Sequence, residues 1–197
     1  MRKGEKTRQL IIEKSAQIFN EKGYYQTSIS DIMSETGLKK GGIYRHFKDK
    51  NELMIEAFYF SVKKVRNFYL EKTTSKSNEL ILLKTFFDVF KHLADDIPIS
   101  GGCPIFNASI EMDCQQGSDL LPHAQNSMHR LIDLITEILE SGITNGTFHA
   151  NISARDLAVF FISSLEGGLA LTKLYKDSQY LLAVCENLER DIQSFVK

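Results

Sequence analysis

Proline scarcity limits the fold of this chain more than any other feature. The 197 residues contain only three prolines: Pro98, Pro104 and Pro122. No stretch alternates apolar and polar residues between turn dipeptides, as half-buried strands do. Apolar residues recur instead at helical spacing, as at Ile12, Ala16 and Phe19. Because a proline inside a helix removes a hydrogen bond and strains the turn, long proline-free stretches with this periodicity predict an all-α chain.

Glycines and capping residues divide the chain into separate helices. Gly23 and Gly37 are typical helix ends, because glycine adopts the left-handed conformation at low cost. Ser28, Asp49 and Ser153 each precede an acidic residue by three positions, which is the spacing of a capping box at a helix start. The expected helices cover about residues 3–22, 28–37, 39–47, 50–73, 77–96, 104–116, 120–143, 153–175 and 178–196.

Charge is sorted along the sequence, although the net charge is only −1. Residues 1–72 carry 15 Lys and Arg against 9 Asp and Glu, a balance of +6. Residues 73–197 carry 9 against 16, a balance of −7. A basic N-terminal third joined to an acidic remainder indicates a head that binds a polyanion and a body with another role.

The composition predicts a cytoplasmic protein without a metal site. The N-terminus starts with positive charge, but its apolar run covers only residues 10–12, which is too short for a signal peptide. No stretch approaches the roughly 18 apolar residues of a membrane span. Cys103, Cys114 and Cys185 are odd in number and lack CxxC spacing, so we expect reduced and mostly buried thiols. Asp113 beside Cys114 does not make a metal-binding cluster.

The stretch TGLKKGGIYRHFKDKNEL, residues 36–53, places two adjacent glycines inside a predicted short helix. Each glycine destabilises a helix by about 1 kcal/mol relative to alanine. Two short helices around a glycine turn, after a longer helix, form a helix-turn-helix, whose second helix enters the major groove of DNA. Leu38, Ile43 and Phe47 can anchor the inner face of this helix. The missing side chains at the glycines would let its backbone approach phosphates and base edges closely.

The outward face of this helix carries the side chains that we expect to touch DNA. Lys40 can reach a phosphate or a guanine, and Arg45 can make a forked contact to either. Tyr44 and His46 can donate to phosphate oxygens. The predicted DNA-contacting residues are Thr27, Ser28, Lys39, Lys40, Gly41, Gly42, Tyr44, Arg45, His46 and Lys50.

Residues 7–53 resemble the N-terminal domain of TetR-family transcriptional repressors. The resemblance rests on Thr7-Arg8, on the spacing of Ile12, Ala16 and Phe19, on EKGYYQTSISDI and on TGLKKGGIYRHFKDKNEL. One departure is Gly42, where the family often has a threonine or serine that can touch bases. Base readout would therefore rest on Lys40, Arg45 or water.

The resemblance implies an all-α protein of about nine helices with two domains. Residues 1–49 would form the helix-turn-helix domain, and residues 50–197 a ligand-binding and dimerisation domain. Such repressors are homodimers that bind near-palindromic operators in double-stranded DNA. A small apolar or amphipathic inducer releases them by spreading the two DNA-binding heads, and no cofactor is implied. The fourth helix would connect the two domains and transmit the change.

The acidic body contains candidates for the inducer pocket. Such pockets are mostly apolar with a few placed polar groups, and Asn107 and Glu111 lie one helical turn apart. The candidates are Phe86, Phe90, Cys103, Phe106, Asn107, Glu111, Met128 and Phe161. Ordinary core packing is the alternative for each of them.

Two features of the last helices predict a dimer seam. Gly167 and Gly168 interrupt a strong helical pattern, which indicates the close approach of another backbone, and the final helix has heptad spacing. The expected interface residues, in a seam of two helices from each subunit, are Leu165, Gly168, Leu181, Cys185, Leu188 and Ile192. Packing of both stripes on the core of their own subunit is the alternative.

Other classes of function have less support. The five histidines are scattered, and the sequence has no HExxH motif or nucleophile elbow, so we do not expect an enzyme. An all-helical small-molecule carrier or adaptor with a vestigial helix-turn-helix is the alternative function. Such a protein would have no need to keep Lys40, Arg45 and Lys50 together, because these are the cations that a phosphate backbone requires.

Overall fold

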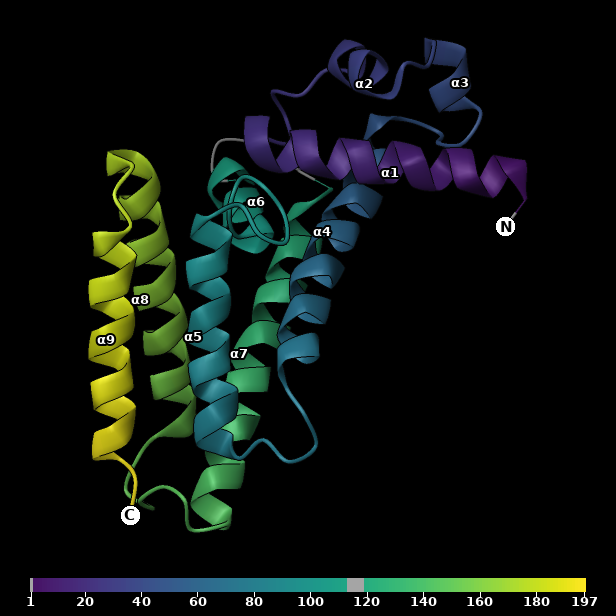
Figure 1. Ribbon diagram of the computed structural model, residues 1–197. Helices are drawn as coiled ribbons and strands as arrows, with labels where there is room; N and C mark the ends of the chain where they lie inside the picture. The colour runs from purple at the N-terminus through teal and green to yellow at the C-terminus, as the bar shows by residue number, and fades with distance from the viewer. Residues whose placement is uncertain (1, 113–118) are drawn as a thin grey trace. The chain divides into compact units, whose positions relative to one another are not determined.

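The computed structural model describes residues 2–112 and 119–197 of the chain. Over these residues the protein contains nine α-helices and no strand, which confirms the all-α prediction (Figure 1). Asp113, Cys114 and the predicted end of the sixth helix lie outside the described residues. The helices are α1 (Lys3–Lys22), α2 (Ile29–Thr36), α3 (Lys40–Tyr44), α4 (Lys50–Lys72), α5 (Glu79–Ala94), α6 (Pro104–Met112), α7 (Leu121–Thr144), α8 (Ala154–Tyr175) and α9 (Gln179–Ser194).

Local signals in the sequence set most of the helix ends. Gly23 and Gly37 follow the last residues of α1 and α2, with φ of 103° and 69° respectively. The Asp49 carboxylate accepts a hydrogen bond from the backbone N–H of Glu52 at 2.9 Å and so caps the start of α4. The capping box predicted at Ser153 was wrong, because this residue precedes α8 but its side chain makes no capping hydrogen bond.

The helices pack into two compact units, which we describe separately. The first unit consists of Met1–Val65 and Ile99–Ser127, and the second of Arg66–Pro98 and Met128–Lys197. The helices α4 and α7 contribute to both units. The predicted boundary between a DNA-binding domain (residues 1–49) and a ligand-binding domain (residues 50–197) is a division by function. The two units are defined by packing, so this boundary stays a prediction.

In the first unit, α1 packs against α2 and α6 (Figure 1). An aromatic cluster fills the core: Tyr24 stacks on Phe19 with 5.7 Å between ring centroids, and Phe58 of α4 meets Tyr24 edge-on at 6.1 Å. Ile43 and Phe47, predicted to anchor the third helix, are at most 2% exposed. Helices as short as α2 and α3 are unstable alone, so this burial, worth about 1.5–3 kcal/mol for each large side chain, holds them in place.

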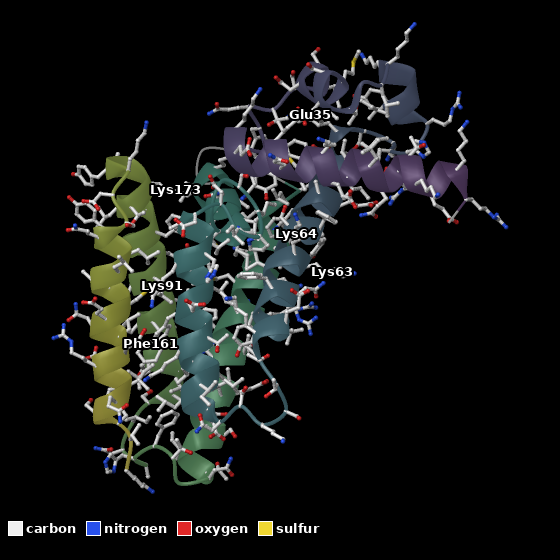
Figure 2. The ribbon with its side chains drawn as sticks, in the orientation of Figure 1. Glu35, Lys63, Lys64, Lys91, Phe161 and Lys173 are labelled. Atoms are coloured by element: carbon white, nitrogen blue, oxygen red, sulfur yellow. The ribbon has the colours of Figure 1, made fainter. Side chains whose placement is uncertain are left out.

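In the second unit, α5, α8 and α9 lie side by side (Figure 1). Phe87 of α5 and Phe161 of α8, the latter labelled in Figure 2, meet edge-on with 5.5 Å between ring centroids, and both are fully buried. At the partly exposed edge, Lys91 of α5 pairs with Glu189 of α9 at 3.3 Å. These contacts show that aromatic packing forms the core of this unit and ion pairs lie at its rim.

The start of α5 is fixed by a separate polar cluster in the second unit. The Glu79 carboxylate accepts hydrogen bonds from Ser141 and Asn145 at 2.8 Å and from Thr147 at 3.2 Å. The Glu79 backbone amide, followed by Asn145, holds the pKa of this carboxyl below its ordinary value. The cluster therefore ties α5 to the end of α7.

Helix α8 is long and apolar enough to cross a membrane by length and composition alone. Its most apolar 18-residue window has a mean hydropathy of 1.5, and 44% of that window is buried inside the protein. The prediction that no stretch approaches a membrane span was therefore wrong for this helix. Burial of its inner face against α5 and α9 is typical of a core helix.

Candidate nucleic-acid interface

The helices α2 and α3 form a helix-turn-helix whose first helix is capped at both ends. The backbone N–H of Asp31 donates to Ser28 Oγ at 3.2 Å, and the Ser28 N–H donates to the Asp31 carboxylate at 2.8 Å. These bonds from the Ser28 side chain and backbone hold the pKa of Asp31 well below its ordinary value. The Ser28 hydroxyl also donates to Asp31 Oδ2 at 2.6 Å, so this predicted DNA-contacting residue is committed to the helix cap.

Helix α3 is shorter than the sequence predicted. It spans five residues, Lys40–Tyr44, instead of about 39–47. The chain continues in hydrogen-bonded turns, in which the N–H of His46 donates to the carbonyl of Ile43 at 2.9 Å. Glycine occupies two of the five helical positions, and its low helix propensity explains the early end.

The fold of the described chain does not require glycine at position 41 or 42. Neither Gly41 nor Gly42 has a positive φ. A Cβ at Gly41 would meet no atom within 4 Å, and one at Gly42 would meet only the Leu38 side chain, at an ordinary distance of 3.7 Å. Alanine at each position would favour the helix by about 1 kcal/mol. Packing among the described residues therefore gives no reason for glycine at either position.

Exposed cations surround these glycines. Lys39, Lys40 and Arg45 are exposed, and none of them forms an ion pair with another residue that the structure describes. The Lys40 ammonium lies 5.9 Å from the ring centroid of Tyr44, which is 37% exposed. Cations without ion-pair partners beside a bare backbone are complementary to phosphate groups.

Three further lysines, which the sequence analysis does not predict as DNA contacts, extend this cationic surface. Lys48 follows α3, and Lys3 and Lys6 lie in the first turn of α1; all three are exposed. A Cβ at Gly4 would lie 4.0 Å from the half-buried ring of His46, so the first turn of α1 lies beside the residues that follow α3. The sequence shows the charge of these lysines, but only the fold shows that they are neighbours.

Two residues predicted to touch DNA point elsewhere. Thr27 is fully buried, and its hydroxyl donates to the carbonyl of Gly23 at 2.6 Å. The Lys50 ammonium donates to the carbonyl of Tyr25 at 3.1 Å, and desolvation by burial lowers the pKa of this amine. The predicted phosphate contacts of Thr27 and Lys50 are therefore corrected, because both polar groups are used inside the first unit.

The predicted inducer-pocket residues are divided between the two units. Phe86, Phe90, Met128 and Phe161 belong to the second unit, and Cys103, Phe106, Asn107 and Glu111 belong to the first. Phe86 and Phe90 are at most 4% exposed, and their ring centroids are 5.4 Å apart, so they pack as core. Cys103 is also buried, whereas Phe106 and Met128 are half-buried.

Within the described residues, no three His, Cys, Asp or Glu side chains form a group that could hold a metal ion.

Asn107 and Glu111 are turned toward the end of α1. The Asn107 amide donates to the carbonyl of Gly101 at 2.8 Å, and the Glu111 carboxylate accepts the backbone N–H of Tyr24 at 3.0 Å and of Tyr25 at 3.1 Å. Their predicted role as the polar groups of a pocket is therefore corrected, because both side chains bind backbone groups of the first unit.

All six residues predicted for the dimer seam are buried inside the chain itself. Leu165, Leu181, Cys185, Leu188 and Ile192 are at most 2% exposed, and Gly168 is buried as well. A Cβ at Gly168 would lie 3.1 Å from the Leu181 side chain, so the absence of a side chain at this glycine lets α9 of the same chain pack closely against α8. Burial raises the pKa of the Cys185 thiol to about 11. The heptad stripe therefore joins α9 to α5 and α8, and its assignment to the dimer seam is corrected.

The opposite side of α8 is exposed and apolar. Gly167 lies there, without a positive φ, and a Cβ on it would meet no atom within 4 Å. Phe160, Leu171 and Leu174 are 48%, 42% and 71% exposed. We call this surface the outer face of α8; it consists of Val159, Phe160, Ser163, Gly167, Ala170, Leu171 and Leu174. None of these seven residues is charged, and the exposed Asp156 lies one helical turn before Val159 and Phe160.

A capped helix-turn-helix with a bare, cationic second helix, on an all-α chain, defines a DNA-binding regulator of transcription. Comparison with known families supports this class. The family described as "Bacterial regulatory proteins, tetR family" matches residues 11–57, and "Tetracyclin repressor-like, C-terminal domain" matches residues 81–188. The chain therefore belongs to the TetR family of transcriptional regulators, which confirms the resemblance of residues 7–53.

Individual relatives resemble the chain over nearly its full length. A TetR transcriptional regulator from Chloroflexus aurantiacus is 34% identical with a TM-score of 0.93, covering 100% of this chain and 98% of the other. A TetR-family regulator from Cytophaga hutchinsonii is 28% identical with a TM-score of 0.88 and the same coverage. The transcriptional repressor DhaR from Mycobacterium sp. is 24% identical, covering 92% of this chain and 91% of the relative.

Proposed function

We propose that the protein is a cytoplasmic homodimeric repressor. It binds a near-palindromic operator in double-stranded DNA and leaves it when a small apolar or amphipathic inducer binds. The observation that carries the DNA-binding part is Gly41, where the fold leaves room for a side chain and the helix would be more stable with one. A DNA duplex in direct contact with the backbone at this position would leave no room for a side chain, which explains the glycine.

The exposed cations fit the role of phosphate and base ligands. With α3 in the major groove, the Arg45 guanidinium can make a bidentate contact to guanine, which is worth about 1–3 kcal/mol of discrimination. Lys40 and Lys48 supply phosphate contacts next to it, and Lys3 and Lys6 extend them along the backbone. Each neutralised phosphate releases counterions, so the affinity falls steeply as the salt concentration rises.

The outer face of α8 supports the homodimer. Gly167, like Gly41, is a helical glycine with free space where its side chain would be, and apolar side chains flank it. We assign this face to a second copy of the chain, because glycine lets two helices approach closely and a single head makes too few contacts for a specific operator. The proposed interface is therefore centred on Gly167 and not on the buried stripe of α9.

Repression and release by an inducer rest on the relatives and on the apolar second unit. One relative is named a repressor, and the matching C-terminal domain is described as tetracyclin repressor-like. The pocket for such an inducer is proposed in the second unit, whose inner side chains are mainly aromatic and apolar, as those of ligand pockets are.

Fluorescence anisotropy with a duplex from the intergenic DNA beside the gene tests the proposal. We expect specific binding at about 150 mM salt and a steep loss of affinity at higher salt. Arg45→Ala should weaken binding by about 1–3 kcal/mol and relax the preference at one base pair. If the protein binds no duplex even at low salt, this result would instead favour a carrier or adaptor with a vestigial helix-turn-helix.

A further inference from the structure

The turn between α1 and α2 is held by a side chain from α6. The Glu111 carboxylate accepts both the Tyr24 and the Tyr25 backbone N–H, at 3.0 and 3.1 Å. A Cβ at Gly23 would lie 3.0 Å from Glu111 Oε1, so the glycine leaves room for the carboxylate. We call these two hydrogen bonds the Glu111 clasp. Hydrogen bonds that involve an ionised group are roughly twice as strong as neutral ones, so this is a firm attachment.

The same turn is also bound by the start of α4. The Lys50 ammonium donates to the carbonyl of Tyr25 at 3.1 Å. The backbone of Tyr25 is thus held at its N–H by α6 and at its carbonyl by α4. Two helices outside the helix-turn-helix therefore fix the residue from which the chain enters it.

A second attachment, one helical turn earlier on α6, reaches the end of α1. The Asn107 amide donates to the Asn20 carbonyl at 3.2 Å. The Asn20 amide, which is buried, donates in turn to the carbonyls of Ser100 and Gly102 at 2.7 and 2.9 Å. A Cβ at Gly101 would lie 2.3 Å from the Asn20 carbonyl oxygen, so this contact is tight. The segment 100–111 is therefore attached at two points, to the end of α1 at Asn20 and to the turn that follows α1.

The clasp lies directly before the DNA-binding helices. The Thr27 hydroxyl donates to the Gly23 carbonyl at 2.6 Å, so residues 23–27 form one hydrogen-bonded turn. Ser28, the next residue, caps α2. A displacement of this turn therefore moves the start of α2, because Ser28 follows the turn directly and caps that helix. In sequence, α6 lies between α5 and α7, which both contribute to the second unit.

We infer that Glu111 is a positioning residue for DNA binding. Its carboxylate fixes the orientation of α2 and α3 through the turn at Tyr24 and Tyr25, and this orientation decides how well α3 fits the major groove. This inference rests on the proposed function and assigns to it a residue that touches no DNA. Without the clasp, α3 samples more orientations, and fewer of them fit the major groove.

Glu111→Ala tests the inference with a matched control in the other unit. Couplings between sites are typically 5–150-fold in affinity, and we expect about tenfold weaker binding of a duplex that the parent protein binds. Glu111→Gln, which keeps one acceptor oxygen, should give an intermediate affinity. The control Glu79→Ala removes three side-chain hydrogen bonds in the second unit and should lower stability without changing the affinity.

Hydrogen–deuterium exchange gives a second readout that does not depend on DNA. Faster exchange confined to about residues 20–38 in Glu111→Ala, and unchanged there in Glu79→Ala, would support the positioning role. The inference is overturned if Glu111→Ala binds the duplex within twofold of the parent, or if Glu79→Ala loses as much affinity. A parent protein that binds no duplex refutes the proposed function instead, so the two failures are distinguishable.

Discussion

Replacing Gly41 with alanine should change stability and DNA binding in opposite directions. The added methyl group meets nothing within 4 Å, and the backbone at this position is compatible with alanine. Alanine also restricts the unfolded chain, so the free energy of unfolding should rise by about 0.5–1 kcal/mol. In the proposed complex, the methyl group projects from the same surface toward the duplex. It would push α3 away from base edges whose hydrogen bonds fail beyond about 3.2 Å.

The binding free energy should fall by the worth of about one base contact, roughly 1–3 kcal/mol, which raises Kd by about 5- to 150-fold. Urea unfolding followed by circular dichroism measures the stability, since the chain has no tryptophan to report by fluorescence. Fluorescence anisotropy measures the affinity. A Gly41→Ala protein that binds the operator as tightly as the parent would refute the argument from the bare backbone.

Gly37→Ala is the matched control. A Cβ at Gly37 also meets nothing within 4 Å, but φ is 69°, in the left-handed region. This variant should lose about 1 kcal/mol of stability or more, because only the backbone conformation opposes it. If Gly41→Ala were destabilised as much as Gly37→Ala, our claim that the fold does not need Gly41 would be wrong.

Four further predictions follow from individual side chains. Lys48→Met should weaken duplex binding evenly across sequences and reduce the salt slope by about 1, whereas Lys50→Met should leave the salt slope nearly unchanged. Gly167→Ala should stabilise the folded subunit by about 1 kcal/mol but weaken the dimer, and light scattering should show a mass below twice 22.4 kDa at concentrations where the parent is dimeric. Tyr24→Phe removes a buried hydroxyl that has no hydrogen-bond partner among the described residues, so the free energy of unfolding should rise by about 1 kcal/mol; a decrease would contradict this assignment. Burial raises the pKa of the Cys185 thiol to about 11, so at pH 8 peptide mass spectrometry should find this thiol alkylated only after unfolding.

The sequence by itself determined the helices and the DNA-binding motif. The capping box at Ser28 and the glycine after α2 act over three or four residues, so their outcome depends little on the rest of the chain. The fixed spacing of residues 7–53 also identified the family correctly. The exposed cations Lys40 and Arg45 were predictable, because the inner positions of the same helix are apolar.

Only the tertiary structure decided what each helix face touches. Periodicity shows which residues share a face, but it does not show whether that face meets the same chain, a second copy or solvent. Gly167 and Gly168 are neighbours in sequence, yet Gly168 packs against α9 and Gly167 faces outward. Glu111 and Lys50 were assigned to an inducer and to DNA, and both bind the turn at Tyr25. The partners of these side chains lie 25 or more residues away, at distances over which a local pattern carries no information.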